Sequence, residues 1–127
     1  MRRRPIPAGA RVVVVRGDDD DPSSDRAQAE AFRERYPDWD RFGLSAYYAE
    51  DEDAVDDLAA DLLERFPVLR LYGPAALEAA GVEVVPTFRA PHVTLAFREL
   101  EAGLHALETV PHDQRPNPYH GEERTQL

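Results

Sequence analysis

The chain contains no cysteine, and this absence removes several kinds of chemistry. It rules out disulfide bonds, a thiolate nucleophile and zinc sites built on cysteine. Long apolar runs are absent too, because no stretch approaches the roughly 20 residues of a membrane-spanning helix. The basic residues 2–4 are not followed by the apolar core of a signal peptide, since the valine run at residues 12–15 is far too short. We therefore expect a cytoplasmic protein that has no contact with a membrane.

Basic residues are scarce in one long segment of the chain. The formal net charge is -10, and residues 18–64 alone hold 17 acidic residues against 4 basic ones. Binding of nucleic acids relies on cations that neutralise phosphates, so we do not expect direct binding of DNA or RNA. Acid at this density either keeps a protein soluble or attracts a basic partner. Composition alone leaves both interpretations open.

Hydrophobic periodicity predicts one domain over residues 11–110. A basic lead at residues 1–10 precedes it, and a polar tail at residues 111–127, which we expect to be flexible, follows it. We expect strands over residues 11–16, 43–48, 68–72, 82–88 and 92–97, and helices over residues 22–36, 53–66, 74–80 and 99–108. This order predicts an α+β (mixed α/β) fold, with a mixed sheet of about five strands packed by three to four helices.

The clearest helix is the one expected over residues 53–66. Asp53 is suited to cap its start, and further acidic residues in the first turn favour the helix dipole. Its apolar residues follow helical spacing and predict a single buried face, made of Val55, Leu58, Ala59, Leu62, Leu63 and Phe66.

The strand expected over residues 92–97 carries the most informative pattern for chemistry. Side chains alternate between the two faces of a strand, so His92 and Thr94 should project together while the apolar residues between them are buried. A histidine that titrates near neutrality beside a hydroxyl can transfer protons. The alternative is a histidine that only hydrogen-bonds a neighbouring backbone group.

Other catalytic and metal-binding patterns are weak. Two-histidine phosphoesterases need a His-x-Ser/Thr pair on each of two strands, and none of the other three histidines is followed by such a residue. The acidic run at residues 18–21 has part of the spacing of a calcium loop, but Ser24 stands where that loop needs glycine. The four histidines have no spacing typical of zinc sites. We therefore expect no metal site.

Two stretches of the first half resemble a known family. The strand at residues 12–17 ends in Arg16-Gly17, and the stretch at residues 42–48 carries Ser45 and Tyr47 before an acidic pair and an alanine-rich helix. This layout resembles that of small ADP-ribosyltransferase-like proteins.

The C-terminal portion carries a second resemblance. From residues 92–97 to the Asn-Pro-Tyr-His sequence at residues 117–120, it is similar to the ends of small actinobacterial proteins from toxin–antitoxin-type gene pairs. Together the two stretches cover about two thirds of the chain.

These resemblances imply a small toxin-like enzyme that acts on NAD or a nucleotide. By this comparison Arg16 and Ser45 would bind the cofactor, NAD. Tyr47 would act with His92 and Thr94 in catalysis. The expected partner of such a toxin is a cognate antitoxin.

The chain departs from the ADP-ribosyltransferase-like pattern at one important position. The glutamate usual on a late strand has no clear match, and Glu83 is the only nearby candidate. The alternative function is therefore non-enzymatic. In this second hypothesis the protein is an antitoxin-like or immunity-like inhibitor, whose acidic residues 18–21 and 50–61 bind a basic partner protein.

Overall fold

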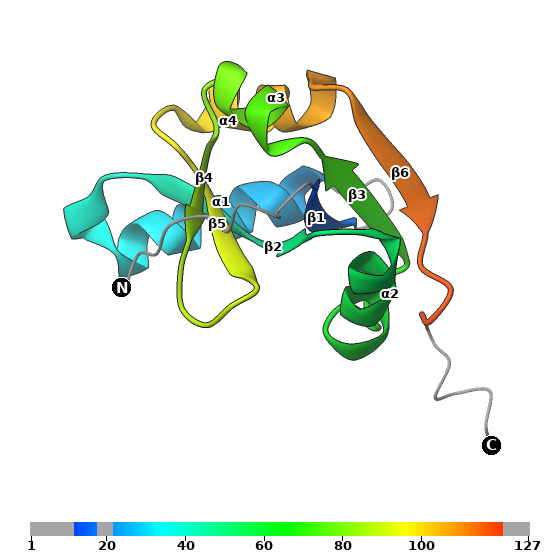
Figure 1. Cartoon of the computed structure of the whole chain (residues 1–127). Coiled ribbons are helices and arrows are strands. Elements are labelled where there is room, and N and C mark those ends of the chain that lie inside the picture. Colours follow the sequence, from blue (N-terminus) through cyan, green and yellow to red (C-terminus); the bar gives the residue numbers. More distant parts are fainter. Residues whose placement is uncertain (1–11, 18–21, 121–127) are drawn as a thin grey trace.

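The computed structural model of the chain describes residues 12–17 and 22–120 (Figure 1). Expectations for residues 1–11, 18–21 and 121–127 lie outside this part. The strands are β1 (Val12–Gly17), β2 (Phe42–Ala49), β3 (Val68–Tyr72), β4 (Glu83–Pro86), β5 (His92–Phe97) and β6 (His112–Pro116); the helices are α1 (Pro22–Arg35), α2 (Glu52–Asp61), α3 (Pro74–Ala79) and α4 (Leu100–Thr109), with a 3₁₀ turn, η1, at Pro37–Trp39. None of the described helices is both long enough and apolar enough to cross a lipid bilayer.

The six described strands form one sheet in the order β4-β5-β2-β1-β3-β6. The α+β class and the single domain are confirmed, but the sequence predicts a mixed sheet of about five strands, whereas every pairing here is antiparallel. The connections give the reason. β2 and β3 run in the same direction, yet β1 lies between them and pairs with both. The parallel strands joined through α2 therefore never become neighbours.

The sixth strand comes from the segment that the sequence predicts to be a flexible tail. β6 is polar and pairs along its whole length with β3, from Tyr72↔His112 to Val68↔Pro116. Just after it, the buried Asn117 donates from Nδ2 to the carbonyl oxygens of Leu63 and Phe66, at 2.8 and 3.2 Å. Backbone pairing and these side-chain hydrogen bonds fix the segment without an apolar pattern.

Helices cover both faces of the sheet. In Figure 1, α3 and α4 lie above the strands and α2 lies below them. The core on the side of α1, α3 and α4 includes Val13, Leu44, Leu77, Leu95 and Leu107. The core on the side of α2 includes Val14, Val55, Leu58, Leu69 and Leu71. β1 lies between the two cores, which explains its unbroken run of buried valines.

α2 is shorter than its apolar pattern predicts. Asp51, not Asp53, caps the helix, because the Asp51 side chain accepts a hydrogen bond from the backbone N–H of Ala54 at 2.9 Å. The helix ends at Asp61, and the turn that follows directs Leu62 outward, so this side chain is 45% exposed instead of buried. Leu63 takes the buried place in the core beneath the helix.

Candidate functional site

A row of polar side chains lies on β2 and β5, on the sheet face that also bears α2. The register pairs Ser45 with Thr94 and Tyr47 with His92. Residues paired across two strands project to the same face, so these four side chains share one face of the sheet. Tyr47 marks the border of the row, since its ring also packs against the core beneath α2. The alternation expected for His92 and Thr94 is present in the structure.

His92 contacts a hydroxyl through each ring nitrogen. Nε2 lies 3.2 Å from the Oγ of Ser45, and Nδ1 lies 3.0 Å from the Oγ1 of Thr87. The Thr87 hydroxyl is in turn 2.7 Å from that of Thr94. Both threonines are buried, whereas Ser45 is exposed. The imidazole therefore connects a buried pair of hydroxyls to one at the surface, and each hydroxyl can donate or accept according to the tautomer.

Aromatic rings surround His92. Tyr47 and Phe88 each meet its ring edge to face, with centroids 5.5 and 5.1 Å apart, and Tyr36 lies 6.2 Å beyond Phe88. Phe88 is 48% exposed, and its φ of 58° lies in the left-handed region. That conformation costs a residue with a side chain roughly 1–2 kcal/mol. Backbone strain of this kind concentrates at functional sites.

The turn between β4 and β5 positions these groups. The Thr87 N–H donates to the carbonyl oxygen of His92 at 3.2 Å, and the His92 N–H donates to that of Arg89 at 3.0 Å. These bonds close a tight turn that begins directly after Thr87, with Phe88 as its first residue. The exposed side chain of Arg89 belongs to the same turn, so one short segment contributes a hydroxyl, an aromatic ring and a cation.

Helix α1 holds the β2 side of the site. The amide oxygen of Gln28 accepts a hydrogen bond from the backbone N–H of Ser45 at 2.9 Å. Gly43, two residues earlier, leaves room for the ring of Phe32, which a Cβ at that position would approach to 2.6 Å. The pairing of β1 with β2 ends at Val14↔Tyr47. Beyond that pair, Gln28 of α1 provides the hydrogen-bond acceptor for the backbone of β2.

Four of the five predicted site residues are close together, namely Ser45, Tyr47, His92 and Thr94. The fifth, Arg16, pairs through its backbone with Leu69 on β3, and its side chain lies outside the described part of the structure. The Thr94 hydroxyl is buried and contacts Thr87 instead of His92, so its link to the imidazole is indirect. The catalytic and cofactor-binding roles assigned to these residues remain predictions.

Sequence reasoning missed Thr87, Phe88 and Arg89. They lie in a turn, where no periodicity identifies the direction of a side chain. The one signal in the sequence is distance along the chain, because all three lie within five residues of His92.

Glu83 does not approach His92. It lies on β4 opposite Ala96, four residues along β5 from the histidine, which corresponds to roughly 13 Å. Its Oε2 accepts a hydrogen bond from the Nε of Arg41 at 3.1 Å. Within the described residues, no group of three or more His, Asp or Glu side chains could hold a metal ion.

Comparison with known proteins identifies no relative. No family model, curated protein or solved structure matches the chain. The resemblances to ADP-ribosyltransferase-like and toxin–antitoxin-type proteins therefore stay predictions.

Proposed function

We propose that the protein is a small enzyme that acts on NAD or another nucleotide at the surface around His92. The observation that carries this proposal is the position of the imidazole between the hydroxyls of Ser45 and Thr87. A general base is usually an imidazole in which one ring nitrogen is oriented by a hydrogen bond and the other faces the group that loses its proton. ADP-ribosyl transfer is the reaction that the sequence resemblance implies.

In that reaction the exposed side of His92 would be the reactive one. A hydroxyl of an acceptor, or a water molecule, attacks C1′ of the ribose attached to nicotinamide. The C1′–N bond breaks, and nicotinamide leaves with its electron pair. Nε2 of His92 takes the proton of the attacking hydroxyl, which approaches on the exposed side of the ring where the Ser45 hydroxyl lies. The hydroxyls of Thr87 and Thr94 keep the ring oriented while its charge changes.

The rings beside His92 suit a nucleotide substrate. Phe88 presents a half-exposed face, and Tyr47 closes the other side of the imidazole. Flat apolar rings stack on the flat rings of bases or nicotinamide, a contact worth about 1–3 kcal/mol per base. Arg89 is exposed on the same turn and supplies positive charge for a phosphate. We assign the same role to Arg16, as the resemblance implies.

Turnover of NAD by the purified full-length chain tests this proposal. We expect wild type to release nicotinamide, measured by chromatography, and His92→Gln to lose about 10²-fold or more of that rate. His105→Gln is the matched control, because His105 is an exposed histidine on α4, away from the site. It should retain the wild-type rate. Far-UV circular dichroism checks that all three proteins fold.

Growth of bacteria that express each protein gives an independent measurement. We expect arrest with wild type and with His105→Gln, and normal growth with His92→Gln at equal soluble yield. If wild type neither releases nicotinamide nor binds NAD or a nucleoside triphosphate in calorimetry, the protein is not an enzyme of this class. Equal loss in both histidine variants would also contradict the assignment.

A further inference from the structure

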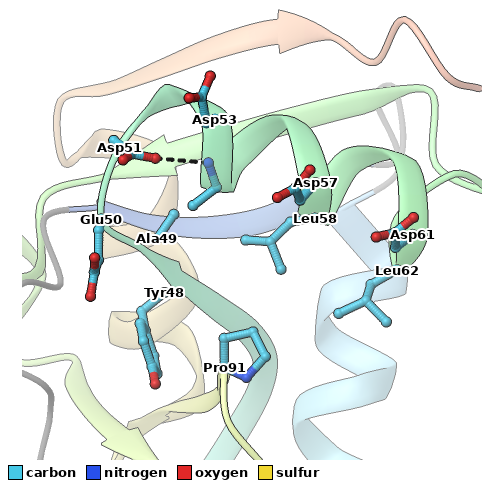
Figure 2. Close-up of a pocket in the computed structure, with 11 residues that line it drawn as sticks. Tyr48, Ala49, Glu50, Asp51, Asp53, Asp57, Leu58, Asp61, Leu62 and Pro91 are labelled. Carbon is cyan, nitrogen blue, oxygen red and sulfur yellow. Dashed lines mark hydrogen bonds between the residues drawn. The ribbon is translucent and has the colours of Figure 1, made fainter.

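A hollow lies beneath α2, and none of the side chains that contact His92 lines it. It is a cavity of about 510 Å³, open to solvent, between α2 and the segment where β2 ends. Figure 2 shows α2 along its upper side, with Tyr48 and Pro91 on the opposite wall. We call this cavity the α2 groove.

Carboxylates follow one edge of the α2 groove. Asp53, Asp57 and Asp61 recur at every fourth position along α2 and line the cavity together with Glu50. With a rise of 1.5 Å per residue, successive aspartates are about 6 Å apart. None of these four side chains forms an ion pair or a hydrogen bond with another described residue, whereas the neighbouring Glu52 is paired with Arg115 at 2.8 Å. The edge is therefore a row of negative charge that forms no ion pair with any basic side chain in residues 22–120.

The interior of the α2 groove is apolar. Leu62 is one of the two large hydrophobic side chains exposed within the described part of the chain. In Figure 2 it points with Leu58 into the space beneath the helix, toward Pro91. Tyr48 completes the far wall. The groove therefore combines an apolar wall with an acidic edge.

We propose that the α2 groove binds an extended segment of a partner protein in which Arg or Lys alternates with apolar residues. Alternate side chains of an extended chain are about 6.6 Å apart on one side, close to the spacing of the aspartates on α2. Cations on that side would meet Asp53, Asp57 and Asp61, and the apolar residues between them would face Leu62 and Pro91. One edge of the groove is acidic and its wall is apolar, which matches a peptide with cations on one side and apolar side chains on the other. This inference does not depend on any chemistry at His92.

A labelled peptide of eight residues, with Arg and Val alternating, is the probe for this surface. Its binding to the full-length chain is followed by fluorescence anisotropy. A second peptide of the same composition, with its four Arg contiguous, tests the spacing. We expect the alternating peptide to bind about tenfold more tightly than the block peptide, with affinity that falls as salt rises.

Two triple variants of equal charge separate the groove from general electrostatics. Asp53→Asn, Asp57→Asn and Asp61→Asn together should weaken binding of the alternating peptide about tenfold or more. Glu34→Gln, Asp38→Asn and Glu78→Gln remove the same charge from exposed positions outside the groove, and this control should bind as wild type does. Leu62→Ser tests the apolar wall and should weaken binding without loss of fold, because the side chain is already 45% exposed.

Several results would overturn the proposal. One is equal affinity of wild type and the Asp53/Asp57/Asp61 variant, and another is equal weakening by both triple variants. Tighter binding of spermine than of either peptide would identify a small polycation as the ligand. Self-association of wild type that the groove variant abolishes would instead identify a second copy of this chain. Because the readout is binding, failure here leaves the test of NAD turnover unaffected.

Discussion

Nε2 of His92 lies 3.2 Å from Oγ of Ser45, although 47 positions separate the two residues in the chain. The pairing of β2 with β5 brings them together, since Ser45 faces Thr94 and Tyr47 faces His92 in the register. The residues next to His92 and Ser45 in the sequence give no indication that these two side chains are in contact. The relationship makes the imidazole accessible from the surface while Thr87 holds it from the interior.

Thr87 is a positioning residue in the proposed site. Thr87→Val keeps the volume but removes the hydroxyl that contacts both His92 and Thr94. We expect kcat for nicotinamide release to fall about tenfold, a part of the roughly 10²–10⁴-fold that a general base contributes, with KM unchanged. Steady-state kinetics measures the split. Thr87→Ser should restore the rate, and failure of this rescue would assign Thr87 to packing alone.

Phe88 has a strained backbone and an exposed ring, and two variants separate the effects of these two properties. Phe88→Gly and Phe88→Ala both remove the ring, so each should weaken nucleotide binding in calorimetry by about tenfold, given a stacking contribution of about 1–3 kcal/mol. Only glycine relieves the left-handed φ of 58°. The glycine variant should therefore be more stable than the alanine variant by about 1 kcal/mol in urea unfolding. Equal stability of the two would argue against strain at this turn.

Gly103 permits α4 to lie against β5. A Cβ at this position would come within 2.1 Å of the Phe97 ring, so Gly103→Ala should destabilise the fold by about 1–3 kcal/mol through overpacking. Gly73→Ala is the matched control, because a Cβ there meets nothing within 4 Å and its φ of -76° suits any residue. We expect the control to be neutral or more stable by about 0.4–1 kcal/mol. Thermal unfolding of the three proteins compares them.

Tyr72 predicts how stability responds to alkali. Burial raises the pKa of its hydroxyl above 10.0, and the hydroxyl donates to the carbonyl oxygen of Leu107. Between the unfolded and the folded pKa the unfolded state binds fewer protons, so the free energy of unfolding falls as pH rises above about 10. The chain has no lysine to titrate in the same range.

The matched variant is Tyr72→Phe, which removes this group from the titration. We expect it to be less stable than wild type at pH 8, because the buried carbonyl of Leu107 loses its donor, at a cost of about 1–3 kcal/mol. Its stability should also decline less steeply than that of wild type from pH 9 to pH 11. If the free energy of unfolding, measured in urea, falls equally steeply with pH in both proteins, a group other than Tyr72 controls the loss of stability in alkali.

Much of the fold follows from local patterns in the sequence. The bounds predicted for residues 68–72 and 92–97 coincide with β3 and β5. The other strands and helices predicted within residues 11–110 lie within two residues of their observed bounds, except that α2 ends five residues before its predicted end. Apolar periodicity of two or of about 3.6 residues is a property of neighbouring side chains and needs no knowledge of the partner. β6 shows the limit, because its polar sequence is held by backbone pairing with β3.

The sequence by itself determined that His92 and Thr94 project to one face of a strand and that residues 18–64 are strongly acidic. Only the tertiary structure decided that Ser45 and Thr87 are the partners of the imidazole. It also decided that Leu62 faces solvent at the α2 groove. The physical reason is the distance along the chain between the residues that interact. Alternation and charge are set by adjacent residues, whereas strand register and the end of a helix depend on contacts between distant segments.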